Sequence, residues 1–219
     1  MLKQLVLILV VVLSACASVK PLEQNMLEGI GKEVVVAKRK MPDFKAVEMT
    51  GAFLFGPIGV LAVSPSQYEA GNLLVRENNI SDPAYQIAES LARSMETKYG
   101  LKYKGVGENI ITDDEVRDIA TAYKGTPLVI DVKTIYWAFA PVPFNFGKYR
   151  VVYHARLRIV DTKNVTVIAE GRCDSLPEKT DDAPTYEALI GDGANRLKSE
   201  LEKESQYCIH EFSSKYLGI

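Results

Sequence analysis

The sequence predicts an α+β fold, a mainly antiparallel sheet with helices packed on one face in a two-layer sandwich. In residues 128–173, apolar and polar side chains alternate along three segments, which is typical of strands covered on one side only. Residues 83–99 and 184–201 instead carry apolar side chains at every third or fourth position, the spacing of amphipathic helices. Because each helix has an apolar stripe to bury, we expect the helices to cover the apolar face of the sheet.

The start of the chain has the three parts of a secretory signal. Lys3 places a positive charge near the amino terminus, an apolar run covers Leu5–Leu13, and the small residues Ser14 and Ala15 follow. The run is too short to span a bilayer, which needs roughly 20 apolar residues. We therefore predict that residues 1–15 are a signal peptide.

The end of this signal resembles the box at which bacterial lipoproteins are cleaved and lipid-modified, with Leu13, Ser14 and Ala15 directly before Cys16. The resemblance implies that Cys16 is the first mature residue, with a diacylglyceryl thioether and usually an amide-linked acyl chain. Two or more chains anchor a protein stably to a bilayer. Ala17 stands where aspartate retains such lipoproteins in the inner membrane, so the resemblance implies the outer membrane, on its periplasmic side. The alternative is an ordinary signal with an accidental cysteine.

Composition indicates one globular domain behind this anchor. Of the 219 residues, 47% are hydrophobic and 25% charged, a mixture that can fill a core. The formal net charge is −2 and there is no basic run, so we expect no nucleic acid partner. We predict the lipidated cysteine and a tether over 16–32 and a single domain over 33–219.

The first half of the domain is predicted to begin with a strand over 33–41 and a short strand over 45–49. An apolar insertion rich in glycine follows at about 51–63, again too short to span a bilayer. Asp82, followed by proline, is a helix-start signal for the helix that Gly100 ends.

Two further helices have recognisable starts. After a strand over 101–106, Thr112 and Glu115 stand three residues apart and form a capping box for a helix that stops at Gly125. The last helix starts at Pro184.

The antiparallel meander is predicted from strands 128–136, 149–160 and 165–173. The connection between the last two fits a type I turn followed by a left-handed asparagine, a hairpin loop with a bulge. This turn sets Asp161 opposite Val165, so that the apolar faces of both strands coincide.

The outward face of the meander is basic. In the predicted register Arg156 pairs with Glu170 and His154 with Arg172. One interpretation is a solvated face with cross-strand ion pairs, and the other is a docking face for an acidic partner. The residues of this basic face are Arg150, Arg156, Arg158 and Arg172.

Two cysteines remain once Cys16 is assigned to the anchor, an even pair in an oxidising compartment. Cys173 lies on the apolar face of its strand, and Cys208 lies seven residues beyond Leu201, on the buried stripe of the last helix. We therefore predict a Cys173–Cys208 disulfide, the alternative being two buried free thiols.

The sequence contains no recognisable set of catalytic residues. The two histidines, His154 and His210, belong to no catalytic signature, and there is no CxxC pair or phosphate-binding loop. We expect neither an enzyme nor a bound metal or cofactor.

Two apolar places look exposed in the sequence, the insertion Gly51–Val63 and the tip of the hairpin after residue 136, and each is either core or contact surface. Aromatic residues are unusual in surface loops, so each place is a possible contact with a membrane or another protein. The alternative is that both fold over one end of the sheet. The aromatic residues concerned are Phe53, Phe55, Trp137, Phe139, Phe144 and Phe146.

The element order over Glu33–Cys208 resembles envelope lipoproteins and, more loosely, the amino-terminal domain of the periplasmic TolB protein and the curli-secretion lipoprotein. This resemblance implies support of assembly, secretion or transport. We expect a non-catalytic, lipid-anchored lipoprotein that binds an envelope protein or further copies of itself. One alternative is a periplasmic carrier that holds a lipid or small apolar ligand between helices and sheet. Another is a hydrolase whose site the sequence does not reveal.

Overall fold

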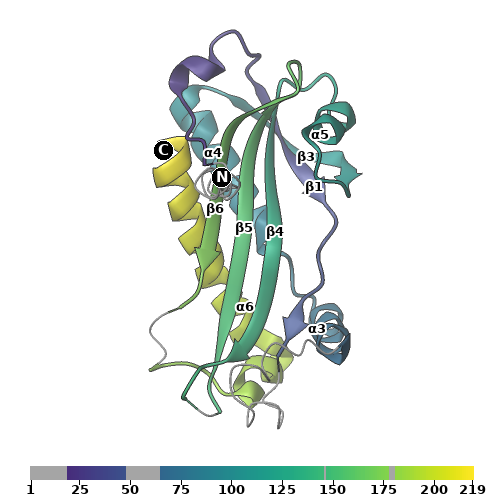
Figure 1. Ribbon diagram of the computed structural model, residues 1–219, viewed down its shortest axis with the longest axis vertical. Helices are drawn as coiled ribbons and strands as arrows, with labels where there is room; N and C mark the ends of the chain where they lie inside the picture. Colours follow the sequence, from purple (N-terminus) through teal and green to yellow (C-terminus); the bar gives the residue numbers. More distant parts are fainter. Residues whose placement is uncertain (1–18, 48–64, 146, 178–180) are drawn as a thin grey trace, which may run out of the picture.

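The computed structural model describes residues 19–47, 65–145, 147–177 and 181–219. Within these ranges six strands form one sheet in the order β3-β1-β4-β5-β6, with β2 paired to β4 beyond the end of β1. Figure 1 shows the long strands β4 and β5 running most of the length of the molecule. The strands are β1 (Glu33–Arg39), β2 (Lys45–Ala46), β3 (Lys102–Ile111), β4 (Leu128–Pro141), β5 (Tyr149–Asp161) and β6 (Thr166–Ser175).

The sheet is mixed, so the expectation of a mainly antiparallel sheet holds only for β4, β5 and β6. β1 runs parallel to both of its neighbours, β3 and β4, and β2 is parallel to β4. Helical crossovers connect β1 to β3 and β3 to β4, and such connections place strands parallel. Alternation along one strand reveals its exposed face but not the direction of its neighbours.

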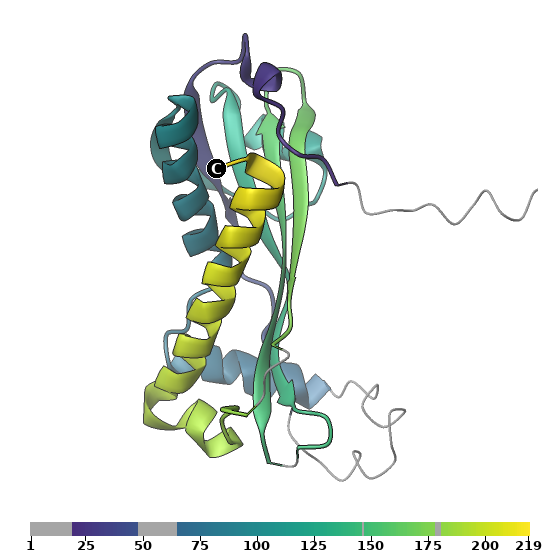
Figure 2. The same ribbon diagram turned by 90° about the vertical axis from the view of Figure 1, so that its left-hand side faces the viewer.

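The main helix layer covers one face of the sheet. It consists of α4, the long α6 and the π-helical turn η3, and Figure 2 shows α4 and α6 side by side on this face. Their buried side chains form the main core with the inward residues of β1, β4 and β5. The bounds are α4 (Pro83–Tyr99), α6 (Tyr186–Glu211) and η3 (Phe212–Leu217).

Helices lie on both faces of the sheet, which corrects the expectation of a one-sided layer. The short helix α5 (Val116–Ala122) packs Ile119 against Val129 and Val160 on the face opposite α4 and α6, forming a second, smaller core. Helix α3 (Pro65–Glu77) packs against β2 near the far end of the molecule, where Gly71 lies so close to the backbone of Phe44 that a Cβ would overlap it.

The helix ends agree in part with the capping signals predicted from the sequence. Asp82 caps α4 by accepting a hydrogen bond from the backbone N–H of Ala84, and Gly100 ends the helix in a left-handed conformation. The capping box predicted for α5 does not form, because Glu115 is the N-cap residue and makes no side-chain cap bond. Helix α6 contains a break at residues 191–194, three of which are left-handed.

The β5–β6 register differs from the predicted one. Asp161 pairs with Thr166, and Val165 rather than Asn164 adopts the left-handed conformation. The Asp161 carboxylate accepts hydrogen bonds from the backbone N–H groups of Lys163 and Asn164, which holds a longer loop. A bulge between Ile159 and Val160 then restores the match of the apolar faces.

The segment expected to be a tether is largely part of the folded domain. Lys20 forms a two-way backbone bridge with Glu170 on β6, and its Nζ donates to the carbonyl of Val167 at 2.7 Å. The backbone N–H of Leu22 donates to the carbonyl of Tyr216, and a 3-10 turn η1 (Gln24–Leu27) buries its last residue in the main core. None of the helices in the described ranges is long and apolar enough to cross a membrane.

Candidate functional site

The open face of β4, β5 and β6, opposite α4 and α6, carries a row of three cations. Lys133 on β4 pairs with Arg156 on β5, and Arg156 pairs with Arg172 on β6. Side chains that face each other across paired strands lie on the same side of the sheet, so like charges here repel. We call Lys133, Arg156 and Arg172 the cation row.

A buried ion cluster lies next to this row. The Asp131 carboxylate is fully buried and accepts hydrogen bonds from Arg39 at 2.5 and 2.9 Å and from Arg158 at 2.9 and 3.1 Å. Both arginines are themselves buried. A buried carboxylate needs such partners to keep its charge, so the cluster ties β1, β4 and β5 together.

Asp114, in the loop before α5, covers part of the cation row. It accepts two hydrogen bonds from Arg156, at 2.7 and 3.0 Å, and forms an ion pair with Lys133 at 3.1 Å. The hydrogen bond from Arg156 is the main reason that the pKa of Asp114 lies below its usual range, against a smaller opposing effect of burial. Two members of the row are thus partly neutralised.

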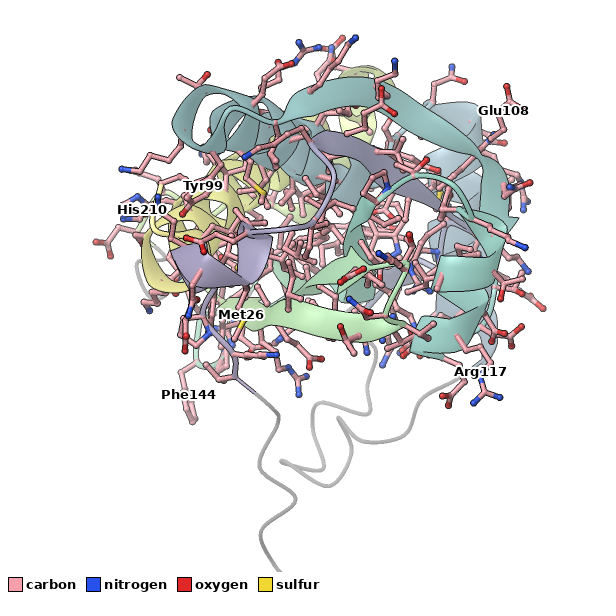
Figure 3. The ribbon with its side chains drawn as sticks, turned by 90° about the horizontal axis from the view of Figure 1, so that it is seen from above. Met26, Tyr99, Glu108, Arg117, Phe144 and His210 are labelled. Carbon is pink, nitrogen blue, oxygen red and sulfur yellow. A yellow bond between two sulfur atoms is a disulfide. The ribbon has the colours of Figure 1, made fainter. Side chains whose placement is uncertain are left out.

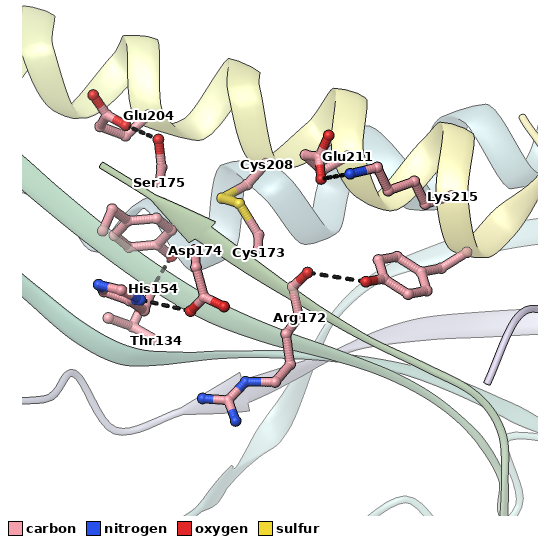
Figure 4. Close-up of a disulfide and its surroundings, with 12 residues drawn as sticks. Thr134, His154, Arg172, Cys173, Asp174, Ser175, Glu204, Cys208, Glu211 and Lys215 are labelled. Atoms are coloured by element: carbon pink, nitrogen blue, oxygen red, sulfur yellow. Dashed lines mark hydrogen bonds and ion pairs between the residues drawn. A yellow bond between two sulfur atoms is a disulfide. The ribbon is translucent and has the colours of Figure 1, made fainter. Parts of the chain in front are cut away.

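The four arginines predicted as a basic face therefore differ in what they can offer a partner. Arg158 is buried on Asp131, Arg156 is held by Asp114, and Arg150 is half-buried. Of the four, only Arg172 is exposed with a side chain that has no hydrogen-bond or ion-pair partner among the described residues, and its backbone carbonyl accepts a hydrogen bond from Tyr216. In Figure 4 its guanidinium extends from β6 to the side away from α6.

Because the register differs from the predicted one, the cross-strand pairs of the open face differ as well. Arg158, not Arg156, stands opposite Glu170, and His154 stands opposite Asp174, whose carboxylate oxygen lies 2.6 Å from Nδ1 of the histidine. Figure 4 shows this pair on the open face beside Arg172.

The hairpin tip is mostly core rather than contact surface. Trp137 and Phe139 are 1% and 0% exposed, and both rings contact Phe44, with centroid distances of 4.9 and 5.9 Å. Their prediction as contact residues is wrong because a bulge between Thr134 and Tyr136 shifts the alternation and turns Trp137 and Phe139 inward.

Phe144 is the exception, being 99% exposed at the turn of the β4–β5 hairpin with a left-handed φ of 62°. Figure 3 shows its ring projecting from the body of the molecule. Three other predicted contact residues, Phe53, Phe55 and Phe146, lie outside the described residues, as does the anchor residue Cys16.

The helix layer and sheet are held together by a disulfide between Cys173 of β6 and Cys208 of α6, with a Cα–Cα distance of 5.5 Å (Figure 4). Both cysteines belong to the main core, whose fully buried side chains include Leu157, Phe212 and Met95.

Asp82, Thr134 and Tyr153 form a buried chain of polar side chains that sequence analysis did not predict. The Thr134 hydroxyl donates to Asp82 and lies 2.8 Å from the hydroxyl of Tyr153. Burial raises the pKa of Asp82, and it raises that of Tyr153 well above its usual value. Asp82 and Thr134 line a cavity of about 210 Å³ where the chain leaves the sheet after β1. The cap role of Asp82 was visible in the sequence, but its long-range partners were not.

The fold and this face define an α/β domain with a mixed sheet, a disulfide-held helix layer and a charged open face. No model of a known protein family matches the sequence, and no curated protein matches it.

Several solved structures are similar to this chain at low identity and low TM-score. A homologue of a neuraminyllactose-binding hemagglutinin from Helicobacter pylori has 10% identity and a TM-score of 0.33, over 89% of this chain and 90% of that one. A lipoprotein from Neisseria meningitidis has 9% identity and a TM-score of 0.28, over 78% and 98%. The PelC dodecamer from Paraburkholderia phytofirmans has 11% identity and a TM-score of 0.29, over 87% and 92%. These values are too low to indicate a function or a partner for this chain.

Proposed function

We propose that this chain is a non-catalytic lipoprotein, anchored through Cys16 to the outer membrane on its periplasmic side, whose domain binds another envelope component at the tip of the β4–β5 hairpin. The anchor rests on the signal sequence and the lipoprotein-like box before Cys16. The two remaining cysteines, bonded to each other, suit an oxidising compartment.

The observation that carries the binding role is the exposure of Phe144. A phenylalanine that is 99% exposed leaves its whole apolar surface in water, and its neighbours Trp137 and Phe139 are buried. Exposed aromatic side chains that a partner then buries are frequent centres of binding energy.

The described residues on either side of the apolar insertion lie at the same end of the molecule as the hairpin. Val47, the last described residue before it, donates its backbone N–H to the carbonyl of Phe139 on β4. Figure 1 shows β2 and α3, the elements before and after the insertion, toward that end of the long strands. The insertion itself lies outside the described residues.

The carrier alternative is less well supported. A carrier of this fold would hold its ligand between the helix layer and the sheet, where fully buried side chains and the disulfide already occupy the space.

Photo-crosslinking in cells tests the proposal. We expect p-benzoylphenylalanine in place of Phe144 to form an adduct with a specific envelope protein, or with a second copy of this chain. The same residue in place of Lys163, exposed in the β5–β6 loop, is the matched control and should form none. Absence of an adduct at position 144, or the same adducts from both positions, would rule out the tip as the binding surface.

A further inference from the structure

The position at which the folded domain begins restricts how far it can move from its anchor. Lys20 is fixed to β6 by its two backbone hydrogen bonds with Glu170 and by its Nζ bond to Val167. Cys16 precedes Lys20 by four residues in the sequence. A fully extended chain spans at most about 3.5 Å per residue, so the anchor atom lies within about 14 Å of this edge of the sheet.

The free cation of the row lies beside this point of attachment. Arg172 follows Glu170 by two residues on β6, a step of roughly 7 Å along a strand. Its guanidinium extends to the open face (Figure 4). A lipid anchor at Cys16 therefore keeps Arg172 within about 20 Å of the phosphate layer of the bilayer, even with the linking residues fully extended.

The electrostatics of the open face favour an anion at this place. Arg156 and Arg172 face each other directly, and Asp114 pairs with Arg156 and Lys133 whereas Arg172 has no such ion pair among the described residues. The Nε of Arg156 is a buried donor without a partner among the described residues. Guanidinium groups bind phosphate oxygens in a paired geometry, so a phosphate beside Arg172 would offset the repulsion within the row.

From these observations we infer that the open face of β5 and β6, centred on Arg172, docks on the phosphate layer of the membrane that holds the anchor. This inference rests on the proposed lipid anchor at Cys16. The short link makes the membrane the partner present at the highest local concentration, which favours lipid phosphate over a diffusing acidic protein. The docked domain would keep a fixed orientation rather than swing on a flexible tether.

The first test locates the membrane-facing surface. The full-length lipoprotein is purified with its anchor and placed in vesicles of phosphatidylcholine and phosphatidylglycerol. We expect p-benzoylphenylalanine in place of Asp174, exposed on the open face, to form phospholipid adducts visible by mass spectrometry. The matched control carries it in place of Lys98, exposed on α4 in the opposite layer, and should form few.

The second test removes the attraction at Arg172, whose side chain has no hydrogen-bond or ion-pair partner among the described residues. In the Asp174-substituted protein, Arg172→Glu should lower the yield of lipid adducts at least about fivefold, since one basic side chain at an anionic surface contributes about that factor. Lys98→Glu makes the same change of charge on the helix layer and should leave the yield unchanged. Vesicles of phosphatidylcholine alone should reduce the difference between the two variants.

The outcomes separate a failure of membrane docking from a failure of the lipid anchor. Equal lipid adducts from positions 174 and 98, no lipid adduct from position 174, or adducts in cells only with an acidic protein would overturn membrane docking and leave the anchor standing. If the intact mass of the same preparation lacks the lipid at Cys16, the anchor and the docking inference both fail.

Discussion

At the residue scale, Asp131 decides what the arginines of the sheet can do. Its buried carboxylate forms ion pairs with Arg39 and Arg158. Arg158, which the sequence pattern placed on the outward basic face, therefore stabilises the fold and is not available to a partner. Alternation predicts correctly on which side of a strand an arginine lies. It contains no information about a carboxylate one strand away, because that depends on register and on strand order.

Asp131→Asn should be strongly destabilising. The change leaves two buried guanidinium groups without their closest counter-charge, which costs about 3–5 kcal/mol of unfolding free energy in comparable cases. Urea denaturation measures the loss. Asp174→Asn is the matched control, and because its side chain is 56% exposed it should cost about 1 kcal/mol or less. Equal losses in both variants would contradict the structural role of Asp131.

Asp82 should make stability depend on pH in a defined direction. Burial raises its pKa in the folded protein, so over the range between its unfolded and folded values the folded state binds the proton more tightly. As pH falls from neutral into that range, protonation of Asp82 should therefore raise the unfolding free energy, by up to about 1.4 kcal/mol per pH unit.

Asp82→Asn keeps an acceptor for Ala84 and Thr134 but removes the titrating group. Urea denaturation at a series of pH values should show a flatter profile for this variant than for the parent. An unchanged profile would mean that Asp82 does not titrate with a raised pKa.

At the element scale, bulges explain most of the differences between prediction and structure. The helices α4 and α6 and the strands of the meander follow from periodicity because their patterns are long. The bulge at Thr134–Tyr136 reverses which aromatic residues of β4 face the core. The longer β5–β6 loop and the bulge at Ile159–Val160 together change the cross-strand pairs of β5 and β6. A bulge adds one residue to a strand without a characteristic change of composition, so neither bulge could be predicted from the sequence pattern alone.

The disulfide belongs to the same scale, because it joins β6 to α6. Replacing both Cys173 and Cys208 with alanine should lower the unfolding free energy by about 3–4 kcal/mol, from the chain entropy of a loop of 35 residues. Urea denaturation under non-reducing conditions provides the measurement. Alkylation of the native protein before digestion should modify neither cysteine, and full modification of Cys173 would show that the bridge is absent.

At the scale of the whole molecule, the two proposed surfaces lie in different places. The described chain starts beside β6 and η3, whereas the hairpin with Phe144 reaches the opposite end of the long strands (Figures 1 and 2). An anchor at one place and a binding tip at another would let the domain bridge a membrane and a partner. The sequence did not reveal that residues 20–32 fold back onto the domain, and of the aromatic residues predicted at the tip it did not separate the exposed Phe144 from the buried Trp137 and Phe139.

The anchor at Cys16 is the claim on which this account depends most, and intact mass spectrometry of the protein extracted from cell membranes tests it directly. The account predicts a chain that begins at Cys16 and carries the mass of a diacylglyceryl group and an acyl chain, with Cys16→Ser remaining unprocessed and unacylated. A chain that retains Met1, or begins at another residue with Cys16 unmodified, would contradict it.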